Sequence, residues 1–305
     1  MQNLEFMQSE SAHPFIKWVG GKSQLLEVIR QKYPMILSPA ITKYAEPFIG
    51  GGAVLLDVLT SWNLEEVYIS DSNLELINTY RAVRDEVEGL IEYLRKFQIE
   101  FLALDKAERK LYYYAKRDRF NAIELRDDSG LNLEKAALFI FLNKTCFNGL
   151  YRVNSQGQFN VPMGDYKNPC ICDPKNLSIL SRLLKKVKMH HGDYRESFDF
   201  IDEHTFVYFD PPYRPLSATS GFTSYTEGAF NDDSQRELAE YARRLDQKGA
   251  KVLLSNSDPK NTDPNDNFFD DLYAGFEIQR VEATRMVNCN ADARGKIREL
   301  LISNF

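Results

Sequence analysis

Residues 43–52, Lys-Tyr-Ala-Glu-Pro-Phe-Ile-Gly-Gly-Gly, decide the fold of this chain. The residues before the glycines predict a short strand, and the three glycines predict a turn into a helix that starts near Ala53. A second strand is predicted at residues 66–70, directly before Asp71. Two strand, turn and helix units in succession are typical of a parallel α/β sheet.

Further strands and helices are predicted along the rest of the chain. Strand-like runs lie at residues 188–191, 205–209, 251–255, 276–284 and 297–302. A helix is predicted between Ser234 and Gln247. Residues 74–143 lack strand-like runs and carry apolar residues at helical spacing, which predicts long amphipathic helices. The sheet is therefore expected to be split by a mainly helical insert.

The insert is predicted to end in a hairpin or an ordered loop. Residues 148–166 are rich in Gly, Asn, Gln and Pro around β-like pieces at 149–153 and 158–161. We therefore expect an α/β domain of residues 1–80 and 181–305, interrupted by an insert of residues 81–180. Residues 258–267, rich in Pro, Asn and Asp, predict a surface loop to which the sequence assigns no chemistry.

The composition excludes several classes of protein. The 305 residues carry a formal net charge of −6, and the histidines form no ligand pattern, so no metal site is expected. The cysteines, which have no Cys-x-x-Cys spacing, are Cys146, Cys170, Cys172 and Cys289. The N-terminus lacks the features of a signal peptide, and no segment is apolar enough to span a bilayer, so we expect a cytoplasmic protein with reduced thiols.

Basic side chains gather in two stretches, although the net charge is negative. They are Lys106, Arg109, Lys110, Lys116, Arg117 and Arg119, interleaved with three tyrosines, and then Arg182, Lys185, Lys186 and Lys188. Because affinity for phosphate follows local charge, these stretches are candidates for DNA binding. A solvated helix face is the alternative for each stretch.

The glycine turn can bring a ligand close to the backbone, because glycine has no Cβ. A dinucleotide-binding fingerprint would need a glycine at the sixth place from Gly50, where Leu55 stands, which disfavours a hydride-transfer enzyme. Asp71 follows at the end of the next predicted strand, where its carboxylate could accept hydrogen bonds from ribose hydroxyls. A glycine turn without a ligand and a helix N-cap at Asp71 are the alternatives.

Residues 15–23, Phe-Ile-Lys-Trp-Val-Gly-Gly-Lys-Ser, end like a phosphate-binding loop. Such a loop needs a glycine five places before Gly21, and that place is Ile16. A sulfonium cofactor suits the segment better, because the face of Trp18 attracts a cation and Lys22 can pair with a carboxylate. A role for Trp18 in the core is the alternative.

The strongest signal is residues 207–213, Val-Tyr-Phe-Asp-Pro-Pro-Tyr. Pro211 and Pro212 stop the predicted strand and hold Asp210 at the carboxyl edge of the sheet, where α/β enzymes bind ligands. The Asp210 carboxylate and the Pro211 carbonyl could each accept one N–H of an exocyclic amine, so that its lone pair points at a methyl donor. Tyr213 could stack on the base, which must be flipped out of a duplex to reach this edge. A plain strand-terminating turn is the alternative.

With these motifs the chain resembles the class α, or D12-class, DNA adenine-N6 methyltransferases, which include GATC-methylating enzymes of bacteria and phages. The resemblance covers nearly the whole chain and rests on residues 15–22, 47–52, 71, 148–154, 192–193 and 210–213. It implies a Rossmann-like methyltransferase sheet with a target-recognition insert. It also implies S-adenosylmethionine as the cofactor and double-stranded DNA as the substrate.

The resemblance implies roles for individual residues. Cofactor contacts would come from Trp18, Lys22, Phe48, Gly50, Gly52, Asp71, Asp193 and Asp210. DNA contacts would come from Asn148, Leu150, Arg152, Asn154 and Pro162. Arg152 could pair bidentately with guanine, and the likeness of residues 148–154 and 158–162 to GATC-specific members favours GATC as the target. A folding role for this hairpin is the alternative.

Two other classes of function remain open from the sequence. A methyltransferase acting on cytosine N4, RNA or a protein amide could use a similar loop, although the aspartate in the first place and the long insert favour adenine in DNA. A DNA-binding or interaction module would explain the basic stretches but not the joint occurrence of the glycine turn, Asp71 and Asp210. No obligatory protein partner is expected, so a monomer or weak dimer suffices. The sequence does not distinguish a restriction system from a solitary methylase.

Overall fold

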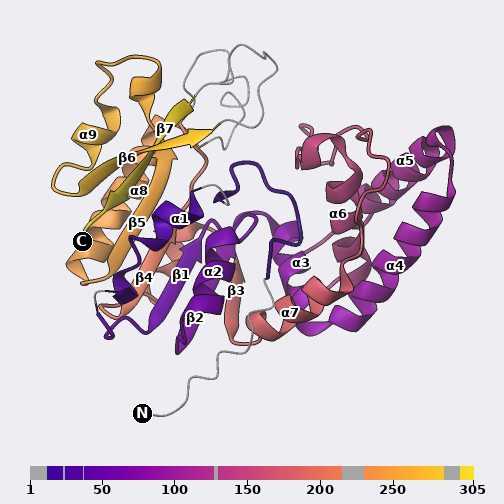
Figure 1. Cartoon of the computed structure of the whole chain (residues 1–305), viewed down its shortest axis with the longest axis horizontal. Coiled ribbons are helices and arrows are strands. Elements are labelled where there is room, and N and C mark those ends of the chain that lie inside the picture. Colours follow the sequence, from indigo (N-terminus) through magenta and orange to yellow (C-terminus); the bar gives the residue numbers. More distant parts are fainter. Residues whose placement is uncertain (1–11, 23–24, 37, 127–129, 215–229, 285–295) are drawn as a thin grey trace. The chain divides into compact units, whose positions relative to one another are not determined.

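The computed structural model describes residues 12–22, 25–36, 38–126, 130–214, 230–284 and 296–305 (Figure 1). The chain forms two compact units, each made of several segments. The first unit combines residues 1–21, 50–62 and 71–192, and the second combines residues 22–49, 63–70 and 193–305. The functional division into residues 81–180 and the remainder stays a prediction.

The second unit is built on a mostly parallel sheet with the strand order β2-β1-β4-β5-β7-β6. The strands are β1 (Lys43–Pro47), β2 (Glu66–Asp71), β4 (Thr205–Phe209), β5 (Lys251–Ser257), β6 (Glu277–Thr284) and β7 (Lys296–Ser303). Strands β2, β1, β4 and β5 run parallel, whereas β7 pairs antiparallel with both β5 and β6. The carboxyl ends of β1, β4 and β5 therefore meet at one edge of the sheet.

Burial explains why β4 forms the centre of this unit. All five residues of Thr205–Phe209 are buried, as expected for a parallel strand that is covered on both faces. Helix α8 (Asp232–Gln247) contributes Leu238, Ala242 and Leu245 to the core around Val207. The shorter helices of the unit are α1 (Leu26–Arg30), α9 (Phe268–Leu272), η2 (Pro34–Ile36), η4 (Tyr194–Ser197) and η6 (Pro259–Asn261).

The first unit is mainly helical. It contains α2 (Ala53–Ser61), α3 (Leu74–Asp85), α4 (Val87–Ala103), α5 (Lys106–Ala122), α6 (Leu133–Thr145), α7 (Pro174–Leu184), η3 (Phe147–Gly149) and the strand β3 (Val187–His191). Helix α6 is its centre, because residues 135–143 are buried on every side of the helix. The ring of Phe141 packs against Phe101 of α4 and Tyr112 of α5.

The predicted hairpin forms, but it contains two isolated bridges instead of regular strands. Val153 pairs with Phe159, and Cys146 pairs with Met163. The side chain of Asn121 in α5 both donates to and accepts from the backbone of Phe159, at 3.1 and 2.9 Å. The hairpin is therefore tied to the helices of the first unit.

The α/β class, the helical stretch and the positions of the strands are confirmed, with shifts of one or two residues at some ends. One prediction needs correction. Residues 261–265 are exposed, as expected of a surface loop, but Asp258 is completely buried against Arg280 and Arg298. An acid next to prolines resembles a loop in sequence, and nothing local reveals the two arginines of the distant strands.

Membrane segments, thiols and metal ligands can be assessed for the described residues. No helix in these ranges is long and apolar enough to cross a membrane, and no group of three His, Cys, Asp or Glu side chains in them could hold a metal ion. Cys146 and Cys172 are buried free thiols and Cys170 is an exposed one. Cys289 lies outside the described residues.

Candidate active site

The carboxylate of Asp210 lies directly after β4 and is paired with a cation. Lys22 Nζ is 2.6 Å from Asp210 Oδ1, and Ser255 Oγ donates to the same oxygen at 3.1 Å. The Lys22 side chain is 5% exposed and that of Asp210 is 23% exposed. Sequence reasoning selected both Lys22 and Asp210 but missed their pairing, because it assigned Lys22 to a carboxylate of the cofactor.

A second hydroxyl group, that of Tyr208, contacts Ser255. Tyr208 OH and Ser255 Oγ are 3.0 Å apart. Because Ser255 has one proton and directs it to the nearby carboxylate, Tyr208 must donate to Ser255. Burial raises the pKa of the Asp210 carboxyl, and Lys22 and Ser255 oppose this rise. The two donors thus favour the charged carboxylate in a site that disfavours charge.

The residues that follow Asp210 are held by side chains from other elements. Gln235 Nε2 donates to the Pro212 carbonyl at 3.0 Å. Tyr213 OH donates to Glu299 Oε2 at 2.6 Å, and Lys22 Nζ lies 4.6 Å from the centre of the Tyr213 ring. The loop is therefore an anchored structure, which a plain strand-terminating turn would not need.

Phe48 lies at the carboxyl end of β1 in the same unit. Its φ of 128° is unusual for a residue with a side chain, and such strain gathers at functional sites. The backbone N–H groups of Phe48 and Ile49 both donate to the Ser70 carbonyl at 3.0 Å, which holds the chain in this shape. The Phe48 ring stacks on Tyr194, with the ring centres 5.2 Å apart.

Asp193 has a local structural role in addition to its predicted cofactor contact. It caps η4, and its Oδ1 accepts from Arg195 Nε at 2.6 Å. Although burial raises the pKa of Asp193, the hydrogen bonds from Arg195 lower it overall. A contact with the cofactor would therefore be made by an ionised carboxylate that is already oriented.

The glycine turn and Asp71 lie together in the first unit. Gly50 N–H donates to Asp71 Oδ2 at 3.1 Å, and Asn73 N–H donates to Asp71 Oδ1 at 3.0 Å. Tyr80 OH donates to the Gly50 carbonyl at 3.1 Å. Burial raises the pKa of Asp71, and the hydrogen bonds from Asn73 and Gly50 oppose this rise. The alternative role of Asp71 as a helix N-cap is wrong, because Asn73 caps α3.

Trp18 packs on this glycine turn. A Cβ at Gly50 would lie 2.7 Å from Trp18 Cδ1, and Gly50 and Gly52 have positive φ values of 46° and 70°. A side chain at Gly50 would therefore clash with the indole and strain the backbone. The indole also stacks on Tyr151, 6.0 Å away, and remains partly exposed.

Asn143 holds the segment that carries Trp18, and sequence reasoning missed it. Its Oδ1 accepts from Lys17 N–H at 2.8 Å, and its Nδ2 donates to the carbonyls of Lys17 and Gly149 at 2.8 and 3.0 Å. The side chain is 4% exposed. One buried amide thus fixes both the N-terminal motif and the start of the hairpin.

The predicted DNA contacts are mostly accessible. Asn148, Arg152 and Pro162 are exposed, Leu150 is partly exposed, and Arg152 Nε donates to Asn160 Oδ1 at 2.7 Å. Phe147, which the sequence analysis did not select, exposes 52% of its surface beside Asn148. The sequence alone does not show which phenylalanines are exposed, so no sequence signal pointed to Phe147.

Asn154 differs from the other predicted contacts. Its Oδ1 accepts from the backbone of Gln156 and Gln158, at 3.0 and 2.9 Å, and so builds the turn of the hairpin. A folding role, which was the alternative, is therefore present at Asn154. A cavity of about 330 Å³ beside this turn is lined by Arg117, Asp118, Asn121, Ala122, Asn154, Gln158, Phe159 and Asn160.

The first basic stretch has more than one role. Arg109 donates to the carbonyls of Phe101, Leu102 and Leu104, and Arg119 pairs with Glu134 at 2.6 Å. These two arginines stabilise the helices. Arg117 instead lines the cavity next to the hairpin.

Comparison with known proteins identifies the chemistry. The sequence profile of the D12 class N6 adenine-specific DNA methyltransferases matches residues 18–287. The chain belongs to this family. This D12-class enzyme is an adenine-specific DNA methyltransferase that uses S-adenosylmethionine and binds DNA. The predicted family, the methylation of adenine in DNA and the predicted cofactor are confirmed. Cytosine N4, RNA, a protein amide and a pure binding module do not fit the family.

Three relatives of this methyltransferase match nearly along their whole length. The type II methyltransferase M.MjaIII of Methanocaldococcus jannaschii is 50% identical, with 96% of this chain and 99% of the relative covered. The type II methyltransferase M1.LlaDCHI of Lactococcus lactis subsp. cremoris is 40% identical, with 99% of each covered. The DNA adenine methylase of Escherichia coli is 31% identical, with 94% and 93% covered.

Removing the Ser255 hydroxyl should shift the pH dependence of methyl transfer. Ser255→Ala removes a hydrogen bond that lowers the pKa of Asp210, so that pKa should rise. Because transfer by the D12-class enzyme is expected to need the ionised carboxylate, the acid limb of the single-turnover rate should move to higher pH. Ser197→Ala, which removes another buried serine hydroxyl next to a tyrosine, is the control and should leave the profile in place. An unmoved acid limb in Ser255→Ala would contradict this role.

Asn143→Ala should weaken the binding of both ligands of this methyltransferase. The loss leaves buried backbone groups without partners, each costing about 1–3 kcal/mol, and releases both the Trp18 segment and the hairpin. Titration with S-adenosylmethionine and with DNA should show a loss of about tenfold or more in each affinity. Asn78→Ala removes a comparable buried amide that bonds twice to the backbone of Asn132. This control should lose stability but keep both affinities, and equal losses in the two variants would refute the assignment.

Proposed function

We propose that this enzyme transfers the methyl group of S-adenosylmethionine to N6 of an adenine flipped out of double-stranded DNA, with GATC as its target. The observation that carries the mechanism is the convergence of Lys22 and Ser255 on Oδ1 of Asp210 at the end of β4. Both donors approach one carboxylate oxygen. The other oxygen, Oδ2, then serves as an acceptor for the substrate.

The amine of adenine is a weak nucleophile because its lone pair is conjugated into the ring. Asp210 Oδ2 accepts one N–H of this amine and the Pro211 carbonyl accepts the other, which draws the nitrogen toward a tetrahedral geometry. Pro211 and Pro212 restrict the backbone that presents both acceptors. S-adenosylmethionine, when bound, would supply an electrophilic methyl group to this lone pair. The carbon–sulfur bond would break, S-adenosylhomocysteine would leave, and the nitrogen would release one N–H proton. Tyr213, anchored through its hydroxyl to Glu299, stacks on the flipped base.

The residues of both units fit the cofactor chemically. In the first unit, Trp18 offers an aromatic face, Gly50 and Gly52 leave room for close approach, and Asp71 can accept hydrogen bonds from ribose hydroxyls. In the second unit, the predicted contacts are Lys22, Phe48, Asp193 and Asp210. Lys22 pairs with Asp210, so any contact with the carboxylate of the cofactor would be made by the same ammonium group.

DNA recognition is assigned to the hairpin. Arg152 is exposed and can read a guanine edge, and its bond to Asn160 orients the guanidinium. Asn148, Leu150 and Pro162 lie in the same hairpin. The exposed ring of Phe147 can stack on a base or fill the space that a flipped adenine leaves. Two relatives are named as type II methyltransferases, so we further propose that this enzyme protects the DNA of a type II restriction system.

The catalytic role of Asp210 is tested by product analysis. The protein is incubated with labelled S-adenosylmethionine and unmethylated plasmid, and the DNA is digested to nucleosides. Label should appear in N6-methyldeoxyadenosine, and Asp210→Asn should slow transfer by about 100- to 1,000-fold, because its amide has one acceptor fewer than the carboxylate. Asp199→Ala, an exposed aspartate of the same unit, is the control for charge loss. An unchanged rate of methyl transfer in Asp210→Asn would contradict the proposed mechanism.

Sequence choice is tested separately. Sequencing of the modified sites on the plasmid should return GATC, and a different motif would refute this target. Arg152→Ala should lose about 1–3 kcal/mol of discrimination between GATC and single-substitution sites, with unchanged binding of S-adenosylmethionine. Arg95→Ala removes an exposed arginine of α4 and should weaken DNA binding equally at all sites or not at all.

A further inference from the structure

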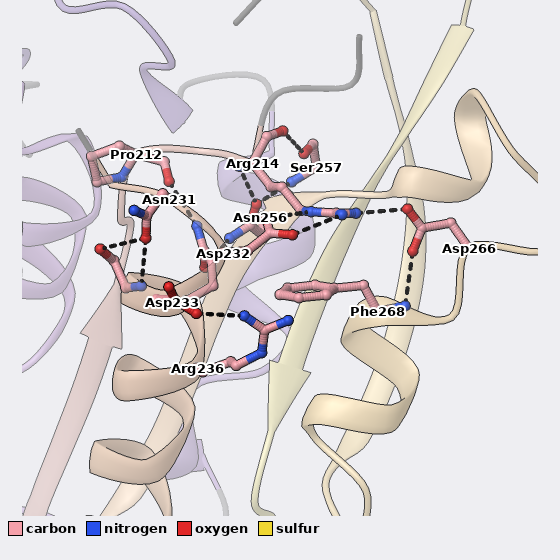
Figure 2. Close-up of polar contacts among 12 residues, drawn as sticks. Pro212, Arg214, Asn231, Asp232, Asp233, Arg236, Asn256, Ser257, Asp266 and Phe268 are labelled. Atoms are coloured by element: carbon pink, nitrogen blue, oxygen red, sulfur yellow. Dashed lines mark hydrogen bonds and ion pairs between the residues drawn. The ribbon is translucent and has the colours of Figure 1, made fainter. Parts of the chain in front are cut away.

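Arg214, the residue that follows the Asp210–Tyr213 loop, is bonded through its whole guanidinium group (Figure 2). Nε and Nη2 form a two-point ion pair with Asp232 of α8, at 2.8 and 3.0 Å. Nη1 pairs with Asp266 at 2.6 Å. The guanidinium also lies over the ring of Phe268, 4.2 Å from its centre. One side chain therefore joins the end of the catalytic loop to two other elements of the second unit.

Hydrogen bonds hold the backbone of Pro212 and of Arg214, the two neighbours of Tyr213 in the chain. Figure 2 shows both residues with their contacts. Before it, Gln235 donates to the Pro212 carbonyl at 3.0 Å. After it, Arg214 N–H donates to Asn256 Oδ1 at 3.2 Å, and Ser257 Oγ donates to the Arg214 carbonyl at 2.9 Å. Asn256 in turn donates to Gln235 Oε1 at 3.1 Å, so the two supports are connected. The loop consequently moves only if this network moves with it.

Asp266 belongs to residues 258–267, the segment without assigned chemistry. Its Oδ1 accepts a hydrogen bond from Phe268 N–H at 2.9 Å, and its Oδ2 accepts one from Arg214 Nη1. The segment itself is anchored by two ion pairs. Buried Asp258 pairs with Arg298 at 3.2 Å, and Lys260 pairs with Asp270 at 2.9 Å. These contacts make the segment a fixed support rather than a free surface loop.

We propose that Arg214 and Asp266 are positioning residues for methyl transfer, through which residues 258–267 hold the Asp210–Tyr213 loop in its reactive geometry. The proposal rests on the proposed role of this loop in presenting Asp210 and the Pro211 carbonyl to the amine. Two prolines restrict the shape of the loop but not its place relative to the sheet. Small displacements of a reacting group reduce rates strongly, so an ion pair that fixes the place of the loop acts on the rate.

The ion pair between Arg214 and Asp266 is expected to contribute little to the overall stability of the fold. The side chains of Arg214 and Asp266 are 22% and 27% exposed, and ion pairs that water reaches contribute little to folding. Its loss should therefore slow the chemical step without unfolding the protein. This separates a positioning role from a structural one.

The test compares single-turnover methyl transfer in full-length variants, using S-adenosylmethionine and a GATC duplex, with melting temperature and both affinities measured in parallel. Asp266→Ala should reduce the single-turnover rate about tenfold while the melting temperature and the affinities stay unchanged. Asp263→Ala, in the same segment, removes a carboxylate that accepts from Asn265 and not from Arg214, and should transfer at the normal rate. A normal rate in Asp266→Ala, or a loss matched by lower cofactor affinity, overturns the proposal.

Double substitution tests whether the two residues act through each other. Arg214→Ala should reduce the rate more than Asp266→Ala, since Arg214 also holds Asp232, and adding Asp266→Ala to it should cause no further loss. Arg214→Lys should restore part of the rate, because it keeps the charge but cannot make the same set of bonds. Independent, multiplying losses overturn the proposal. Asp210→Asn in the same assay reports on the catalytic role itself, so failure of that role and failure of the support are distinguishable.

Discussion

The ion pair between Lys22 and Asp210 is the interaction on which the active site of this methyltransferase depends. A carboxylate that is shielded from water is disfavoured in its charged form, yet the proposed chemistry needs a charged acceptor. The cation at 2.6 Å offsets this cost, and Ser255 adds a second donor. Parallel pairing explains why Ser255 is available: Phe209 and Leu254 are partners in register, so the next residues along β4 and β5, Asp210 and Ser255, emerge side by side at the edge of the sheet.

Most of the fold could be predicted from the sequence, because local patterns indicate the strands and helices. The buried strand β4 contains a continuous run of large apolar and aromatic residues, 206–209, and was predicted at its observed bounds. The glycines before Ala53 marked the start of α2. The pairing of Lys22 with Asp210 could not be predicted in the same way. A pattern shows that a cation and an acid are each suited to a site, but which acid the cation meets depends on how distant segments pack.

The roles of asparagine and aspartate residues are the hardest to predict from the sequence, because their side chains form hydrogen bonds with backbone groups in several ways. At Asp71 a ligand role was favoured over a helix cap only because of the neighbouring glycine turn, and the structure assigns the cap to Asn73. At Asn154 the side chain builds a turn, whereas Asn143 connects two segments far apart in the chain. These residues have no periodicity, and their partners are carbonyls and N–H groups that every residue carries. Local sequence therefore cannot separate a structural amide from one that contacts a ligand.

The same reasoning explains why the Asp-Pro-Pro-Tyr motif is only part of the catalytic device. Proline rings restrict the dihedral angles of the loop, and this restriction is local. The direction in which the carbonyl and the ring point relative to the sheet depends on Gln235, Asn256 and Arg214, which come from or connect to distant elements. The proposed catalysis relies on two acceptors aimed at one nitrogen, so it tolerates little displacement of either. Under this proposal, a segment without a motif, residues 258–267, contributes to the rate by holding the motif in place.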